Sequence, residues 1–410
     1  MARILPFLFA ALFASPSVAS AQGNASVFDA LSLRGFGTLG LARTTNGQAE
    51  VARDLLQPKG ISDNWSARSD SDFGIQANYS VNDTVEVVTQ AVSRYSYKGN
   101  FTPELTELLV KYDPNAYLSL RGGRIGTDFF MHGDSRLIGY SQLTVRPNID
   151  FFSSLAVTYL DGADGQVTLP LGEGLLRGKL YYGFLAEKLP FADGYLNLRN
   201  SRAIGGYLDY QSGNWQWRAG LAGIRFKHSM PEPIGELQAA LRATGLASAA
   251  RAAADLDLQG TNVRYYSFGV VYDRGPLFLQ AMLGHFSYET RAICDQDSAM
   301  FLAGYRMGDF KPFLGYSKVK SKRVHVASGL PDAGQGALIN AALTQVPGQS
   351  YADQHTVSVG VRWDFRRDMA LKLQADLIRG QRDSAYMFRR ESLRWDGDTN
   401  IFSLALDFVF

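Results

Sequence analysis

The sequence lacks several features that would assign the chain to a common class. A single cysteine among 410 residues, Cys294, excludes an internal disulfide. The charges nearly cancel, with 41 Lys and Arg against 39 Asp and Glu, which gives no general case for nucleic-acid binding. After residue 21 no stretch approaches about 18 continuous apolar residues, so the sequence also argues against membrane-spanning helices.

Motifs that carry catalysis or hold a cofactor are also missing. The five histidines show no HExxH motif and no paired metal-ligand spacing. His132, Asp134 and Ser135 are close neighbours in one predicted loop, and such neighbours rarely converge as a catalytic triad. Gly35-Phe-Gly37 lies within a strand pattern, without the strand–turn–helix context of a dinucleotide site. We therefore expect no enzymatic activity, no cofactor and no metal.

The first residues have the composition of an export signal. A positive charge at Arg3 precedes an apolar run over 4–14, and Ala19-Ser-Ala21 supplies the small residues of a cleavage site. The run is too short to span a bilayer as a helix. The sequence predicts a cleaved signal peptide at 1–21 and one exported domain at 22–410.

The chain instead has a hydrophobic period of two residues. In 370–378, apolar Leu371 and Leu373 alternate with the charged residues Lys372 and Asp376. Charges in the centre of a strand are costly against lipid, so these two should face a wet lumen. These strands suit the wall of a membrane barrel, in which half of the side chains face lipid and half face a water-filled lumen. Such a wall also explains a mean hydropathy of only -0.11.

The end of the chain predicts how the sheet closes. Residues 402–410 alternate without a break and stop at Phe410, so that one face of this strand is wholly apolar. An exposed edge of this kind would be an aggregation site, which favours pairing with the first strand of the same chain.

Short and long connections alternate along the mature chain. Seven short turns and eight long loops imply an all-β antiparallel transmembrane barrel of about 16 strands, with short periplasmic turns and longer extracellular loops. The predicted turns begin at Val81, Asp113, Leu171, Ser212, Asp273, Gly308 and Arg366. The predicted loops are 43–72, 97–103, 126–152, 188–201, 229–260, 289–297, 321–352 and 381–398.

Aromatic residues mark the membrane boundary, because amphipathic rings concentrate where lipid meets water. They flank the short turns at Tyr79, Tyr112, Tyr210, Trp215, Tyr272, Trp363 and Phe365. Helix formers dominate 234–254 and 336–344, inside two of the long loops, which we interpret as surface segments over the rim.

Several fragments resemble the proteobacterial outer-membrane porins. They are Leu118-Ser-Leu-Arg-Gly-Gly-Arg124, Asp134-Ser-Arg136, Ile138-Gly-Tyr140, Val145-Arg-Pro147, Asp161-Gly-Ala-Asp164, Ala303-Gly-Tyr-Arg306 and Ala370-Leu-Lys-Leu-Gln374. The resemblance implies a 16-stranded barrel, usually trimeric, in the bacterial outer membrane, whose third loop, here 126–152, folds inward. It also implies that the barrel-assembly machinery reads the strand ending at Phe410. The third loop departs from the best-known general porins because it lacks a dense acidic run.

A channel of this kind needs no covalent chemistry, since lumen width and opposed charges set its selectivity. Eight of twelve strand residues predicted to face inward are basic and three are acidic, which favours a modest anion preference. We predict that the constriction and lumen are formed by Arg94, Lys111, Arg121, Arg124, Asp128, Asp134 and Arg136.

The sequence thus predicts passive diffusion of small hydrophilic solutes through a homotrimeric channel embedded in outer-membrane lipid. Two alternatives stay open. One is a channel specific for a carboxylate, phosphate or sugar. The other is a barrel that acts as an adhesin or as a structural outer-membrane protein, because loops 229–260 and 321–352 are long enough to present a binding surface.

Overall fold

A computed structural model describes residues 30–153, 157–191, 194–385, 387–390 and 395–410 of the chain. The predicted signal peptide, 1–21, lies outside the described residues. None of the described helices is long and apolar enough to cross a membrane.

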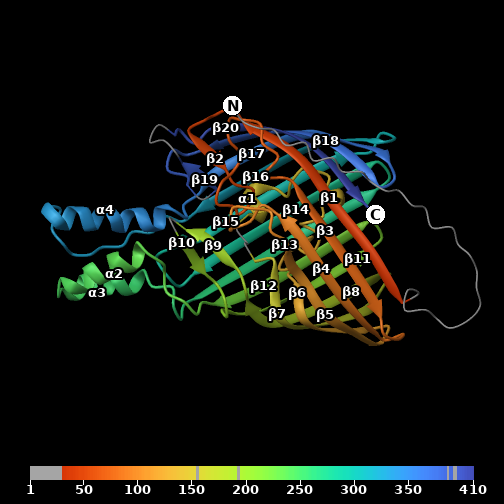
Figure 1. Ribbon diagram of the computed structural model, residues 1–410, viewed down its shortest axis with the longest axis horizontal. Coiled ribbons are helices and arrows are strands. Elements are labelled where there is room, and N and C mark those ends of the chain that lie inside the picture. The colour runs from red at the N-terminus through yellow and green to blue at the C-terminus, as the bar shows by residue number, and fades with distance from the viewer. Residues whose placement is uncertain (1–29, 154–156, 192–193, 386, 391–394) are drawn as a thin grey trace, which may run out of the picture.

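Sixteen antiparallel strands form a closed barrel (Figure 1), as the alternation of turns and loops predicts. The ring closes because β1 (Leu31–Thr44) pairs with both β3 (Asp72–Ser80) and β20 (Thr399–Val409). The other strands are β4 (Val85–Arg94), β5 (Glu104–Asn115), β6 (Leu118–Gly126), β7 (Tyr159–Leu171), β8 (Gly174–Leu185), β11 (Arg202–Ser212), β12 (Trp215–Arg225), β13 (Asn262–Arg274), β14 (Leu277–Tyr288), β15 (Gln296–Tyr305), β16 (Phe310–Ser321), β17 (Asp353–Arg366) and β18 (Met369–Gly380). All seven predicted short turns join consecutive strands of this ring.

The last residue of the chain takes part in the closure. The main-chain N of Gly35 donates to the carbonyl O of Phe410 at 2.8 Å, and the N of Phe410 donates to the O of Gly35 at 3.0 Å. Gly35 also leaves room for the Phe410 ring, because a Cβ at this position would overlap it. The terminal strand is therefore paired along both edges, as its apolar face predicts.

The outer face of the barrel is apolar and exposed. Leu180, Leu39 and Ile204 are 75%, 62% and 62% exposed, which is a costly arrangement in water but a favourable one in lipid. At the short-turn end the exposed side chains include Tyr79, Tyr112, Trp215, Trp363 and Phe365, which form part of the predicted aromatic girdle. The alternation therefore places lipid-facing and lumen-facing side chains as expected.

The opposite end carries the long loops and three helices. The helices α2 (Ile234–Ala243), α3 (Ala247–Asp255) and α4 (Gly334–Gly348) extend beyond the rim (Figure 1). They overlap the two segments predicted to be helical, and α4 is longer than the predicted 336–344 at both ends. Two small sheets also lie in the loops, with β9 (Lys188–Phe191) paired to β10 (Gly194–Asn197) and β2 (Ala49–Val51) paired to β19 (Phe388–Arg390).

Candidate lumen constriction

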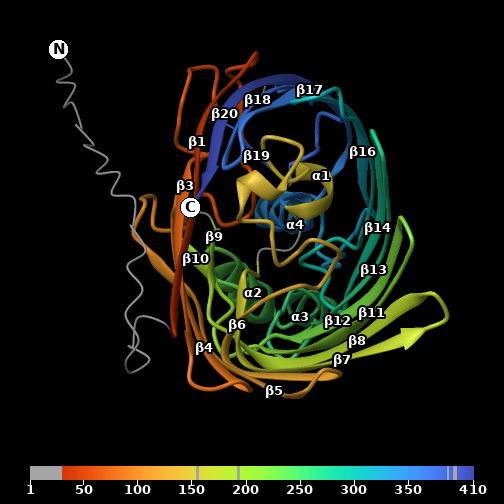
Figure 2. The same cartoon turned by 90° about the vertical axis from the view of Figure 1, so that its right-hand side faces the viewer.

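The third long loop, of which residues 127–153 and 157–158 are described, folds into the barrel. It contains the short helices η1 (Gly139–Ser141) and α1 (Ile149–Phe152), and Figure 2 shows α1 inside the ring of strands. The loop continues past the predicted end at residue 152, because β7 begins only at Tyr159.

Arg146 ties this loop to the lumen wall through buried ion pairs. Its guanidinium donates to both carboxylate oxygens of Asp70, at 2.9 and 2.6 Å, and to Asp376 at 2.7 Å. The Arg146 side chain is 1% exposed. Burial by itself would raise the pKa of Asp70, but the charge and hydrogen bonds of Arg146 outweigh it and lower that pKa. The pair is therefore a specific attachment point for the loop.

Two basic strand residues add hydrogen bonds to the main chain of the loop. Nζ of Lys372 donates to the carbonyl oxygens of Gly139 and Thr144, at 2.8 and 2.9 Å. Nη1 of Arg362 donates to those of Tyr140 and Gln142, at 2.5 and 2.9 Å. Buried carbonyl groups need such partners in a segment with little regular structure. The inward prediction for Lys372 is confirmed, and its partners explain why a lysine is tolerated there.

The other side of the loop is attached by aromatic packing. Phe130 lies 5.0 Å from Phe152 and 6.0 Å from Phe151 between ring centroids, and Phe129 lies 5.1 Å from Tyr181 of β8. All five of these side chains are buried. The loop is therefore held by charges on the β17–β20 side and by rings on the β8–β14 side.

Glycines in the wall make room for the third loop. A Cβ at Gly220 would lie 3.0 Å from the carbonyl O of Phe129, and one at Gly284 would lie 3.3 Å from the Phe151 ring. Both distances are tight for carbon, so a larger side chain at either position would displace the loop.

A polar cavity of about 220 Å³ remains between the loop and the wall formed by β5–β8 and β11. Of the eleven described residues that line it, ten are polar or charged. Nζ of Lys179 lies 2.8 Å from Asp128 and 3.2 Å from Asp164, and Arg121 binds Asp164 at 2.6 Å. Charged side chains that line a channel in this way are the groups that set its ion selectivity.

Four of the seven predicted site residues line this polar cavity. They are Lys111, Arg121, Asp128 and Asp134. The strand pattern places Lys111 and Arg121 inside the barrel, and the inward fold of the third loop brings Asp128 and Asp134 to them.

Arg94 and Arg136 meet at a different point, the end of the third loop. Nη2 of Arg94 lies 2.9 Å from Oγ1 of Thr158, and Arg136 donates to the carbonyl O of Val157 at 2.5 Å. Burial, followed by the nearby charge of Arg94, lowers the pKa of Arg136 to about 10. Both guanidinium groups therefore support the loop where it rejoins the wall.

Glu187, just beyond β8, binds the same junction. Both of its carboxylate oxygens accept the main-chain N–H of Thr158, at 2.9 and 3.0 Å. Burial raises the pKa of Glu187 to about 7, because the ionised form loses its hydration. The charge of this junction therefore changes near neutral pH.

The prediction that Arg124 lines the constriction was wrong. Arg124 is paired in register with Leu108 of β5 and Asp161 of β7, and directly paired residues project from the same face of a sheet. Leu108 is 47% exposed on the outer face, and Arg124 binds Asp161 there at 2.7 Å. Arg121 is the last arginine of β6 that faces the lumen. Arg124 lies three residues further along, just after Gly123 (φ 127°), so strict alternation places Arg124 on the outer face.

Several residues of the constriction were not among the predicted site residues. Asp164 and Tyr207 line the polar cavity, and alternation along β7 and β11 could have placed both in the lumen. Asp70 had no signal in the sequence, because it lies in the first long loop and contacts Arg146 only through the fold.

The described residues give no support to a metal centre or a catalytic triad. No group of three or more His, Cys, Asp or Glu side chains within them is arranged to hold a metal ion. Oγ of Ser135 donates to the main-chain O of His132 at 3.5 Å, and therefore not to the imidazole ring as a nucleophile would.

Comparison with known proteins gives structural matches only. No family model matches the chain, and no curated protein matches its sequence. The high-pH structure of Pseudomonas putida OprB matches with a TM-score of 0.59 at 10% identity, over 94% of this chain and 95% of that one. Salmonella typhi OmpF in complex with daunomycin matches with a TM-score of 0.55 at 12% identity, over 93% and 97%.

An anion-selective porin from Comamonas acidovorans also matches, with a TM-score of 0.53 at 14% identity, over 93% of this chain and 99% of that one. At these identities the likeness shows the fold alone. This chain shares the closed antiparallel barrel of these outer-membrane proteins over nearly its whole length.

Proposed function

We propose that the protein is an outer-membrane channel for passive diffusion of small hydrophilic solutes. One observation carries the proposal. A closed barrel with an apolar outer face encloses a cavity whose lining is polar at ten of eleven positions, beside a loop tied into the lumen. A wet, charged passage inside an apolar cylinder suits transfer of polar solutes across lipid.

The ion selectivity we propose is weak. The excess of basic strand residues in the sequence predicts a preference for anions. The basic side chains that line the polar cavity, however, have acidic partners. Arg121 binds Asp164, Lys179 binds both Asp128 and Asp164, and Lys111 binds Asp113 at 2.7 Å. Paired charges leave little net field to attract one sign of ion, so any anion preference is modest.

The outer wall also supports the proposed homotrimer. The Arg124–Asp161 pair lies on the outer face, where a charged side chain against lipid costs up to about 2–4 kcal/mol. Ala163 and Gly165 lie on the same outer face. Small residues and a charged pair suit contact with a second copy of the chain better than contact with lipid.

Reconstitution into planar bilayers tests the channel function. We expect discrete, ohmic current steps in potassium chloride, with a reversal potential close to zero in a salt gradient. Folded protein that produces no current steps would exclude a channel and would favour the adhesive or structural alternative. Folding is checked independently by the different gel mobility of heated and unheated samples.

A further inference from the structure

A second cavity, of about 920 Å³, lies at the long-loop end of the barrel. The 27 described residues that line it come from the ends of β8, β12, β13 and β14 and from seven of the eight long loops. We call it the mouth cavity. Among the described residues that line it, six are charged or carry an amide or hydroxyl group on an aliphatic side chain: Glu50, Lys59, Gln345, Gln349, Ser350 and Asp383.

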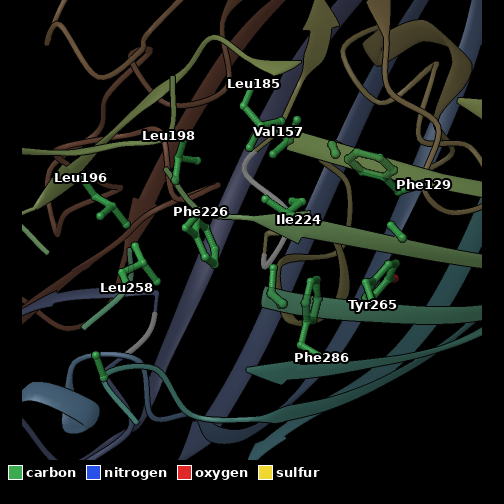
Figure 3. Packing of buried hydrophobic residues seen from close by; sticks show 14 of the residues in the cluster. Phe129, Val157, Leu185, Leu196, Leu198, Ile224, Phe226, Leu258, Tyr265 and Phe286 are labelled. Atoms are coloured by element: carbon green, nitrogen blue, oxygen red, sulfur yellow. The ribbon is translucent and has the colours of Figure 1, made fainter. Parts of the chain in front are cut away.

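The wall of the mouth cavity on the β8–β14 side is apolar. Figure 3 shows Leu185, Leu198, Ile224, Phe226 and Phe286 grouped there, and all five are buried. Five aromatic rings line the cavity: Phe191, Phe226, Phe286, Tyr288 and Phe388. Aromatic rings that line a cavity offer stacking and edge contacts to another ring.

The polar groups lie apart from this wall. All six belong to the first, seventh and eighth long loops, whereas the described residues of the fourth, fifth and sixth loops that line the cavity are apolar or aromatic. A solute in the cavity therefore meets an apolar surface on one side and hydrogen-bonding groups on the other. This division favours one orientation of an amphipathic molecule.

The size of the mouth cavity distinguishes it from a packing defect. Protein interiors are close-packed, and voids much larger than a water molecule are few. Water that filled this space would find few hydrogen-bond partners along the apolar wall, so a solute with an apolar body can displace it favourably. Ligand sites of comparable volume are likewise mostly apolar with a few polar groups.

We propose that the mouth cavity is a binding site for small organic solutes that carry an apolar ring and one polar group, and that it selects them for the channel. The selection step rests on the proposed channel function, but binding does not. Ring-containing solutes bind in the cavity with the ring against Phe226 and Phe286, while sugars of similar size do not.

The test uses indole as the neutral ring-containing probe and sucrose as the polar control. The full mature chain is placed in lipid nanodiscs, and binding is measured by equilibrium dialysis against empty nanodiscs of the same lipid. We expect a saturable excess of bound indole at one site per chain, and no excess of sucrose. The absence of a saturable excess of indole would overturn the proposal.

Two substitutions separate a defined site from general partition into lipid or onto apolar surfaces. Ile293→Trp fills the cavity while adding apolar surface, so it should weaken indole binding by about tenfold or more. Phe191→Ser removes a partly exposed lining ring and should also weaken it. Leu338→Asn, at a residue of α4 that is 73% exposed and outside the lining, is the matched control and should leave binding unchanged.

Binding that survives Ile293→Trp and Phe191→Ser would place the indole elsewhere and overturn the proposal. Planar-bilayer recording of the same preparations keeps the two proposals separate. Current steps without saturable indole binding would reject the site and leave the channel standing. Indole binding without current steps would retain the site and reject the channel.

Discussion

The constriction and the mouth of this barrel use the same strands but hold opposite chemistry. The inward row of β8 runs from Lys179, which lines the polar cavity, to Leu185, which lines the mouth cavity. Six residues, or about 20 Å of strand, separate them. In β12 the inward row likewise passes from Arg218, paired with Asp209, to Ile224 in the mouth lining. The alternation therefore determines on which face of the strand a side chain lies. The distance of an inward residue along the strand determines whether its side chain is polar or apolar.

The two regions also differ in what holds them together. Around the third loop, charges such as Arg146 have specific partners and fixed geometry. Removal of one partner of a buried pair leaves the other charge uncompensated. In the mouth, apolar side chains contact one another without direction, so a single change costs less and is more easily accommodated. This contrast predicts that the constriction is sensitive to single substitutions and the mouth is tolerant.

Arg146→Met is expected to have the largest effect. It leaves Asp70 and Asp376 buried without their cation, which costs roughly 3–5 kcal/mol of unfolding free energy. The loop should then detach from the wall, and single-channel conductance should rise and become noisier. Urea midpoints and planar-bilayer recordings measure the two effects.

The control for this change is Arg306→Met. Arg306 pairs with Asp273 at 2.7 Å, but the two side chains are 36% and 47% exposed, so its loss should cost less than about 1 kcal/mol. Equal effects of the two substitutions would contradict the role of Arg146 in holding the loop.

Glu187→Gln tests the junction between the two regions. Burial raises the Glu187 pKa from 4.5 to about 7, so the fold favours the neutral carboxyl. That contribution is fully present below about pH 4.5 and is lost as the pH rises through 7. The shift corresponds to roughly 3 kcal/mol.

The wild type should therefore lose stability relative to Glu187→Gln between about pH 4 and pH 8, as measured by urea midpoints. Glu173→Gln, at an exposed residue of a short turn, is the control and should follow the wild type. Parallel pH profiles of the wild type and Glu187→Gln would show that Glu187 does not titrate differently in the fold.

Gly220→Leu tests whether the third loop needs space in the wall. The new side chain would overlap the carbonyl O of Phe129, so we expect a loss of about 1–3 kcal/mol and an altered conductance. Gly178→Leu is the matched control in β8, because Gly178 is paired with the outward Leu208, which is 60% exposed. An unchanged conductance for Gly220→Leu would show that the loop does not press on this point.

Asp164→Asn is expected to show its clearest effect in ion selectivity. It removes the shared partner of Arg121 and Lys179 and leaves two cations in the polar cavity with less compensation. The chloride-to-potassium permeability ratio should rise severalfold and fall again with added salt, as screening predicts. Asp273→Asn, at a residue outside the polar cavity, should leave the ratio unchanged. A ratio unaffected by Asp164→Asn would mean that these pairs do not lie on the ion path.

Local patterns in the sequence predicted the strands and the inward side of several charged residues. The turn at Asp113 and the alternation at Lys111 and Arg121 are properties of neighbouring residues, and the structure agrees with them. Arg124 was the exception, because it lies three residues after the inward Arg121 and therefore on the opposite face of β6, so the prediction that it faces the lumen did not follow the alternation.

The sequence by itself determined the barrel, because a period of two residues assigns every side chain to lipid or lumen before any tertiary contact exists. Only the tertiary structure decided where Asp70, Arg146 and Asp376 meet, since they are distant in sequence and come together when the third loop enters the lumen. The same holds for the mouth cavity, whose apolar wall is assembled from separate strand ends and loops. Periodicity is local and can be read along the chain, whereas a site depends on contacts that exist only after the barrel has closed.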